Sequence, residues 1–296
     1  MFGILNINKP QGITSRAVVT QVSRIVGRKV KCGHAGTLDP LATGVLLVCI
    51  GKATKLVPLI HEHSKSYAGT FLLGKKSETD DIEGEVESVA VPDGLDEESL
   101  RELLPEFTGR ITQVPPTHSA IWIDGKRAYD RARNGEDIEM PEREVHIESL
   151  ELTNLDRESF SVEMTCGTGT YVRSIGRDLA RKAGTAAIMS VLTRTSIGPF
   201  SLENAVELEA LNRENILECL QNPLAMLAHL PEYQVTAPQE KTLRYGQRID
   251  LKGDSQTKIN ENDTIVVTDG NQRMIAIAAR RDNQLAPQIV FPESSS

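Results

Sequence analysis

The chain has 296 residues, of which 39% are hydrophobic and 25% are charged, the composition of an ordinary globular protein with one large domain and a small one. Its formal net charge of -8 argues weakly against a nucleic-acid partner. The four cysteines form no Cys-x-x-Cys pair, which argues against a zinc site or a disulfide framework, and no signal peptide or membrane span is visible, so we expect a cytoplasmic protein.

Charge is distributed unevenly along the chain. Residues 1–55 carry eight bases and one acid, whereas residues 78–106 carry twelve acids and one base. This asymmetry reverses the inference from the net charge, because it predicts one face for RNA and an acidic part held away from it. For the acidic part, solvated charges without a partner remain the alternative.

The first elements are predicted from apolar spacing and turn residues. Residues 2–7 form an apolar run that predicts a strand, and residues 9–12 read as a turn. A helix follows with its apolar residues on one face; it begins with Thr14 or Ser15 as the cap and ends at Gly27.

The stretch from Gly33 to Gly44 contains three glycines, a proline and two threonines, so it predicts a loop of fixed shape. The apolar run at residues 45–50 predicts a buried strand or a short helix that anchors the loop. Asp39 is the only acid among residues 1–55. It is either a turn carboxylate that precedes a proline or a catalytic acid in a site built for a polyanion.

Alternating and helical patterns continue through the middle of the chain. Residues 65–74 alternate as a strand that carries Tyr67, by default a half-buried strand tyrosine, and residues 95–107 predict an amphipathic helix. Residues 145–155 and 160–166 predict a hairpin, after which a helix runs to Ala183. Arg173 stands at the start of that helix, where a cation opposes the helix dipole and calls for a partner.

The pattern changes near the C-terminus. Residues 201–229 read as short helices, and four short strands are predicted at residues 243–249, 264–270, 274–279 and 287–291. We therefore expect two domains, residues 1–230 and a small all-β module at residues 231–296.

The stretch Gly-His-Ala-Gly-Thr-Leu-Asp-Pro-Leu-Ala-Thr-Gly at residues 33–44 resembles the catalytic motif of the bacterial tRNA pseudouridine-55 synthases. Nearly the whole chain agrees with that family, at Lys9-Pro10, Lys65-x-Tyr67, residues 79–84, residues 115–135, Gly-Thr-Tyr-x-Arg at residues 169–173 and residues 191–200. The resemblance implies an α+β fold with a mixed, mainly antiparallel sheet flanked by helices, and a small C-terminal RNA-binding module.

The resemblance also implies the chemistry and the residues that perform it. The enzyme would flip uridine 55 out of the T loop of tRNA and isomerise it to pseudouridine, with no cofactor and no metal. Asp39 would be the essential aspartate, Arg173 would pair with it, and Tyr67 would lie against the flipped base. An arginine beside a carboxylate favours the ionised form and fixes its orientation, which fits this pairing.

Four further residues receive substrate-binding roles from the resemblance. Tyr171 would form a wall of the site, Leu192 would line the base pocket, and His34 would help to occupy the space that the base leaves. Lys9, with Pro10, would pack against the active-site loop. Three positions that are often basic in the family are Trp122, Thr168 and Thr193 here, which puts RNA affinity in doubt more than activity.

The resemblance implies the T arm of tRNA as the partner of a monomer that needs no other protein and no membrane. One alternative is a tRNA-binding folding factor without chemistry. The presence of Asp39, Tyr67 and Arg173 argues against this as the sole function. Another is a guide-RNA-dependent synthase in a ribonucleoprotein. The short C-terminal module and the absence of basic tails favour a stand-alone enzyme over the second alternative.

Overall fold

The computed structural model describes residues 1–119, 121–123, 125–136, 138–251, 259–271 and 273–291. The helices are α1 Ser15–Val26, α2 Val57–His61, α3 Glu97–Leu103, α4 Ala128–Arg133, α5 Val172–Lys182 and α6 Ala237–Arg244. Short 3-10 helices are η1 Gly51–Leu56, η2 Leu104–Phe107, η3 Leu202–Asn204, η4 Leu208–Ala210 and η5 Pro223–Leu227. Among the described residues, no helix combines the length and the hydropathy that a bilayer crossing requires.

The strands of the first two-thirds of the chain are β1 Gly3–Lys9, β2 Cys32–His34, β3 Thr43–Ile50, β4 Lys65–Leu73, β5 Lys75–Lys76, β6 Glu87–Ser88, β7 Gly109–Gln113, β8 Trp122–Ile123, β9 Lys126–Arg127, β10 Arg143–Leu155, β11 Ser159–Cys166 and β12 Ala187–Ile197. The later strands are β13 Phe200–Ser201, β14 Val206–Glu207, β15 Glu232–Gln234, β16 Ile249–Asp250, β17 Thr264–Thr268, β18 Met274–Arg281 and β19 Gln284–Val290.

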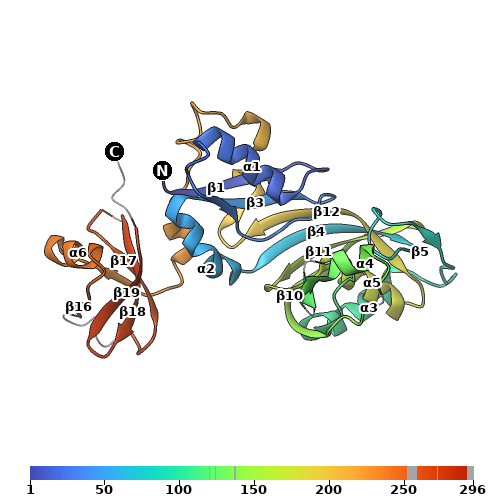
Figure 1. The fold of residues 1–296 in the computed structure, drawn as a ribbon. Coiled ribbons are helices and arrows are strands. Elements are labelled where there is room, and N and C mark those ends of the chain that lie inside the picture. Colours follow the sequence, from blue (N-terminus) through green and yellow to red (C-terminus); the bar gives the residue numbers. More distant parts are fainter. Residues whose placement is uncertain (120, 124, 137, 252–258, 272, 292–296) are drawn as a thin grey trace.

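A mixed sheet forms the body of the molecule (Figure 1). In the described residues it has ten strands in the order β14-β1-β3-β12-β4-β11-β10-β7, with β2 on β3 and β13 on β12. Its pairs are antiparallel except β1 with β14 and β12 with β3. The β12–β3 contact is only two residues long, Thr193 and Arg194 against Thr43 and Gly44. The loop at residues 33–44, which we call the catalytic loop after its predicted role, runs into β3 at this junction. The loop therefore lies near the middle of the sheet.

Both faces of β1 and β3 are covered, which explains their unbroken apolar sequences. Alternate residues of β3 face in opposite directions: Leu46 and Val48 pack with α1, whereas Val45 and Leu47 pack with η1 and α2. Figure 1 shows α1 and α2 on the two sides of these strands. Residues 45–50 are therefore a strand, the first of the two structures that their composition allowed.

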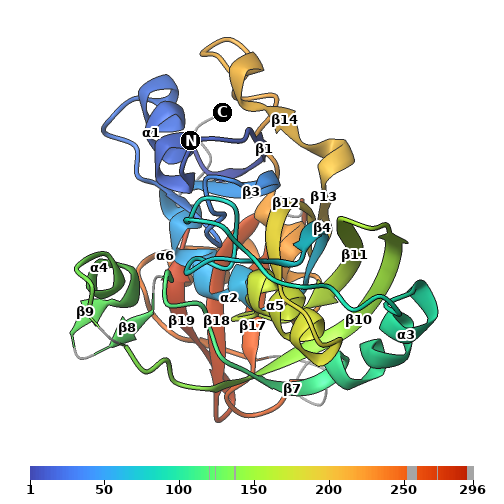
Figure 2. The same cartoon turned by 90° about the vertical axis from the view of Figure 1, so that its right-hand side faces the viewer.

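The other half of the sheet is covered by α3 and α5 (Figure 2). Phe71 of β4 stacks on Phe160 of β11, with 5.0 Å between the ring centroids, and both are fully buried. Gly176 of α5 faces this pair so closely that a Cβ there would lie 2.0 Å from the Phe71 ring. This glycine therefore lets α5, with Arg173 in its first turn, approach the sheet.

Replacing Gly176 by alanine should lower the melting temperature by several degrees. Alanine favours the helix by up to about 1 kcal/mol over glycine, but overpacking against a fixed ring costs about 1–3 kcal/mol or more. Thermal unfolding followed by circular dichroism measures the change. Gly94→Ala is the matched control, because a Cβ at Gly94 would meet no atom within 4 Å. Equal stability of the two variants would show that α5 can shift away from the sheet without cost.

The predicted hairpin is confirmed as β10 and β11, and the helix that follows it is α5. The prediction of one helix over residues 95–107 is wrong at its ends. The α-helix begins at Glu97, after its cap Asp96, and gives way to the 3-10 helix η2 at Leu104. Pro105 explains this change, because it lacks the backbone N–H that a continuing α-helix would use.

The C-terminal residues form a separate sheet in the order β15-β17-β18-β19-β16. The strand predicted at residues 243–249 is wrong: Leu243 and Arg244 end helix α6, and the chain turns before β16. Thr236 and Gln239 form a capping box at the start of α6, and Pro238 stands in its first turn, which together favour a helix. The module is thus β-rich with one helix among its described residues.

The module packs against the α2 side of the main sheet (Figure 1). Phe291 lies 5.0 Å from Phe2 between ring centroids, and Val266, Met274 and Ile277 share one apolar cluster with residues of β1 and β3. The two parts are therefore joined by buried apolar surface as well as by the chain.

Candidate active site

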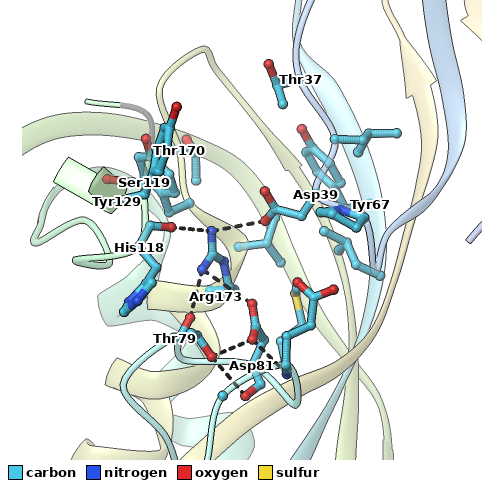
Figure 3. A pocket seen from close by; sticks show the side chains of 18 of the residues that line it. Thr37, Asp39, Tyr67, Thr79, Asp81, His118, Ser119, Tyr129, Thr170 and Arg173 are labelled. Atoms are coloured by element: carbon cyan, nitrogen blue, oxygen red, sulfur yellow. Dashed lines mark hydrogen bonds and ion pairs between the residues drawn. The ribbon is translucent and has the colours of Figure 1, made fainter. Parts of the chain in front are cut away.

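Asp39 lines a cavity of about 1100 Å³ at the central junction of the sheet (Figure 3). The other walls come from segments that are far apart in the sequence: β4, the acidic loop at residues 76–87, residues 118–119, the turn before α5, and β12. The two termini of the catalytic loop are held by β2 and β3, which pair with each other. A rigid sheet thus presents a carboxylate to a large cavity, the arrangement that binding and catalytic loops use.

Asp39 and Arg173 form an ion pair, with 3.0 Å between Oδ2 and the guanidinium NH2. The arginine side chain is 6% exposed and the aspartate side chain 37%. Arg173 also donates to the backbone oxygen of Thr79 at 2.7 Å and to that of His118 at 3.2 Å (Figure 3). With its direction determined by these carbonyls, the guanidinium holds the carboxylate at the cavity wall.

Asp81 is a second carboxylate on Arg173, and the sequence did not single it out. Its Oδ2 lies 3.4 Å from the arginine NH1, and its side chain is only 3% exposed. It accepts hydrogen bonds from the Thr79 hydroxyl and from the backbone N–H of Glu83. The available signal was the acidic loop at residues 79–84, but nothing in its sequence distinguishes the acids that turn inward from those that stay in solvent.

Arg194 of β12 binds the backbone of the catalytic loop, and the sequence analysis gave it no role. It is 1% exposed, and it donates to the carbonyl oxygens of Gly36 at 3.1 Å, Thr37 at 3.4 Å and Val45 at 2.7 Å. Gly44 adopts a φ of 97°, and a Cβ there would lie 2.2 Å from the Arg194 oxygen. Only glycine suits both this backbone conformation and this approach, so the loop and β12 are locked together.

Lys9 of β1 binds the catalytic loop at Pro40. Its ammonium group donates to the carbonyl oxygens of Pro10 at 2.9 Å, Ile13 at 2.8 Å and Pro40 at 3.3 Å, and its side chain is fully buried. Ser15 adds two hydrogen bonds to the backbone of Leu38. Lys9 thus ties the turn at residues 10–13 to Pro40 of the loop, and its substrate-binding role stays a prediction.

Lys9 should make the free energy of unfolding depend on pH. Burial lowers the pKa of Lys9 from 10.5 to about 8, against the opposing influence of Asp39. Between these values the unfolded chain binds more protons than the folded one, so stability rises with pH. Relative to Lys9→Met, which lacks the titrating group, the wild type should gain as much as about 3 kcal/mol as pH rises through this range. Chemical denaturation of both proteins at several pH values measures the difference, and a constant difference would contradict the prediction.

Three residues assigned to the base line the cavity: Tyr67, Tyr171 and Leu192. Tyr67 of β4 pairs with Arg194 of β12, and burial raises the pKa of its hydroxyl. Gln113 holds Tyr171 by exchanging two hydrogen bonds with its backbone, at 2.8 and 3.1 Å. Together the rings and the leucine offer an apolar surface close to Asp39, suited to a planar ring.

His34, like Lys9, does not line this cavity. It ends β2, is half-buried, and its Nδ1 has no hydrogen-bond partner among the described residues. Burial, followed by the charge of Arg194, lowers the pKa of His34, which favours the neutral ring.

The three positions that are often basic in the family have different surroundings. Trp122 is 61% exposed, and the Arg127 guanidinium lies 4.5 Å from its ring centroid. Thr168 lines the cavity, whereas the Thr193 hydroxyl lies 2.9 Å from that of Thr43 at the β12–β3 junction. In the described part of the chain, no three His, Cys, Asp or Glu side chains are grouped to hold a metal ion.

The sequence of this chain is similar to a protein-family model and to several named proteins. A family model described as the N-terminal domain of the TruB family pseudouridylate synthases matches residues 23–172. The protein named tRNA pseudouridine synthase B from Oceanobacillus iheyensis is 38% identical over 98% of either chain. Its namesake from Paracoccus denitrificans is 47% identical over 79% of either chain.

Solved structures agree in fold. The match to a Cbf5-Nop10-Gar1 complex covers 98% of this chain and 84% of that chain, with a TM-score of 0.72 and 23% identity. A structure of an H/ACA RNP bound to a substrate RNA containing 2'-deoxyuridine matches 98% of this chain and 85% of that chain, with a TM-score of 0.72 and 22% identity. The predicted α+β class with a mixed sheet and a β-rich C-terminal module is confirmed.

Proposed function

The chain belongs to the TruB family of pseudouridylate synthases, and we propose that it isomerises uridine 55 in the T loop of tRNA to pseudouridine. The observation that carries the proposal is the Asp39–Arg173 pair, set in a cavity beside Tyr67 and Leu192. The relatives named tRNA pseudouridine synthase B support the substrate.

The reaction detaches uracil from its ribose carbon, turns it, and rejoins it through a carbon atom. No redox step or group transfer to a second molecule occurs, so the chemistry requires no cofactor. Asp39 acts either as a nucleophile on the sugar or base, or as a base that removes a sugar proton. Arg173 serves both routes, because it binds one carboxylate oxygen while the carboxylate stays 37% exposed to the cavity.

Base flipping costs about a few kcal/mol, which contacts to the extruded base must offset. In this proposal Tyr67 lies against the base, and Leu192 and Tyr171 form the other walls of the base pocket. His34, outside the cavity, enters the space that the base leaves in the RNA. Lys9 and Arg194 hold the loop by its carbonyl groups, so their role is to place Asp39.

The basic N-terminal region is the surface we assign to phosphates. On and beside α1, Arg16, Arg24 and Arg28 are exposed, and α1 packs on β3, the strand that follows the catalytic loop. We assign catalysis to residues 1–230 and additional RNA contact to residues 231–296, of which 252–258, 272 and 292–296 lie outside the described residues. We further propose a cytoplasmic monomer that needs no partner protein.

Purified protein and an unmodified tRNA transcript, with no other component, test this proposal. Pseudouridine should form at position 55 and at no other position, and a transcript with cytidine at position 55 should remain unmodified. Binding without conversion would favour the tRNA folding factor. Conversion that appears only after a guide RNA or further proteins are added would favour the ribonucleoprotein enzyme.

A further inference from the structure

Helix α5 carries two arginines, one turn apart, that bind two consecutive acids of the loop at residues 77–84. Arg173 contacts Asp81 as well as Asp39, and Arg177 contacts Asp80 with 2.7 Å between NH1 and Oδ2. The side chains of the outer pair are 12% and 14% exposed. Neither Asp80 nor Arg177 lines the cavity that holds Asp39. The Asp80–Arg177 pair can therefore influence that cavity only through Asp81 and Arg173, which do line it.

The backbone at Asp80 explains how adjacent acids reach two different arginines. Asp80 has a φ of 57°, the left-handed region that non-glycine residues rarely adopt. The main chain on either side is tied to β12, since the N–H of Met189 donates to the Asp80 oxygen and the N–H of Ile82 donates to the Met189 oxygen. A strained conformation persists where the surroundings hold it in place. Here the backbone bonds to Met189 hold the main chain, and the ion pair with Arg177 holds the Asp80 side chain.

Each of the three guanidinium nitrogens of Arg177 donates a hydrogen bond. Its Nε and NH2 donate to the two carboxylate oxygens of Asp178, at 2.8 and 3.0 Å, and NH2 also donates to the Val114 oxygen at 2.8 Å. Burial raises the pKa of Asp80, and the Arg177 charge opposes that rise. Without Arg177, the Asp80 carboxylate would be left without its ion-pair partner in a mostly buried position, and the loop would have reason to move.

We propose that Asp80 and Arg177 are positioning residues for the isomerisation. They hold the loop so that Asp81 meets Arg173, and Asp81 in turn aims Arg173 at Asp39. This inference rests on the proposed function, because its consequence is a slower reaction of the bound tRNA. The pair should affect the chemical step and leave tRNA affinity unchanged, since neither side chain lines the cavity.

The test is a double-mutant cycle on the single-turnover rate and on tRNA affinity. Arg177→Met and Asp80→Asn should each lower the rate about tenfold or more, with Kd within about twofold of the wild type. The double variant should be no slower than the slower single variant, because the two residues act as one unit. In an Asp81→Asn background, Arg177→Met should add less than about a twofold loss.

Matched variants separate the pair from general effects on the fold. Arg181→Met removes the same charge one turn further along α5, at a side chain that is 68% exposed, and should react at the wild-type rate. Asp80→Gly relieves the left-handed backbone but removes the carboxylate, and should be as slow as Asp80→Asn. Arg177→Lys should recover part of the rate, and thermal unfolding verifies that each variant is folded.

A wild-type rate in folded Arg177→Met or Asp80→Asn would overturn the proposal, as would full activity of Asp80→Gly. If Arg177→Met fails to fold, Asp80→Asn and Arg177→Lys decide it in the same way. Independent, multiplying effects in the double variant would also reject it. Failure of the proposed function looks different: the wild type itself would bind tRNA and form no pseudouridine, and both ideas would then fall together.

Discussion

Asp39→Asn should abolish pseudouridine formation, with a loss of at least about a thousandfold in the single-turnover rate. The substitution keeps the size of the side chain and one oxygen for Arg173, but an amide is neither a nucleophile nor a base. Binding of tRNA should stay within about threefold of the wild type, because the proposed phosphate contacts lie on and beside α1 and on the C-terminal module. Rate and affinity are measured on the same tRNA transcript.

Asp96→Asn is the control for this variant. Asp96 is an exposed carboxylate that caps α3, and asparagine caps a helix about as well as aspartate. It should leave both rate and affinity unchanged. Appreciable turnover by Asp39→Asn would remove Asp39 from the catalytic role and leave it as a loop residue.

Arg173→Lys should lower the single-turnover rate by at least about a hundredfold, with a smaller effect on tRNA binding. The planar guanidinium contacts Asp39, Asp81 and two backbone carbonyls at once. A lysine keeps the charge but cannot divide it between two carboxylates in this fixed geometry. Asp39 would thus lose its orientation although it keeps a nearby cation.

Arg173→Met extends the test to the fold. It leaves Asp81, whose side chain is 3% exposed, as a buried charge without its arginine, and breaking such a pair costs about 3–5 kcal/mol of stability. Thermal unfolding measures this loss, and Arg181→Lys on the exposed side of α5 serves as the control. If Arg173→Lys reacts at the wild-type rate, or only binding suffers, then Arg173 is a phosphate contact and does not orient Asp39.

Much of the local structure follows from the sequence alone. The strands β1, β4, β10 and β11 follow from apolar or alternating runs, and side-chain alternation is a property of the strand backbone itself. Thr14 caps α1 and Gly27 follows its end, as their residue types indicate. The motif at residues 33–44 also identified Asp39 and the family, because a run of twelve specific residues carries more information than periodicity.

Local patterns were insufficient where short segments compete. Residues 243–249 are short and partly apolar, and such a segment suits a strand as well as a helix until its cap is considered. The decisive residues, Thr236, Pro238 and Gln239, lie upstream of the segment. Pro105 is a different case, because it lies inside the predicted helix at residues 95–107 and ends the α-helix that the apolar spacing alone would continue.

The supporting residues of the site, Asp81 and Arg194, required the tertiary structure. Asp39 and Arg173 meet although 134 positions separate them in the sequence, and Asp81 and Arg194 become site residues only because the sheet buries them. A charged side chain has the same sequence signature whether it is solvated or paired in the interior. Its partner is determined by which strands adjoin, and here the two-residue contact between β3 and β12 places the loop on Arg194. The sequence, through the family resemblance, thus named Asp39 and its pairing with Arg173, while long-range packing decided that Asp81 and Arg194 hold them in place.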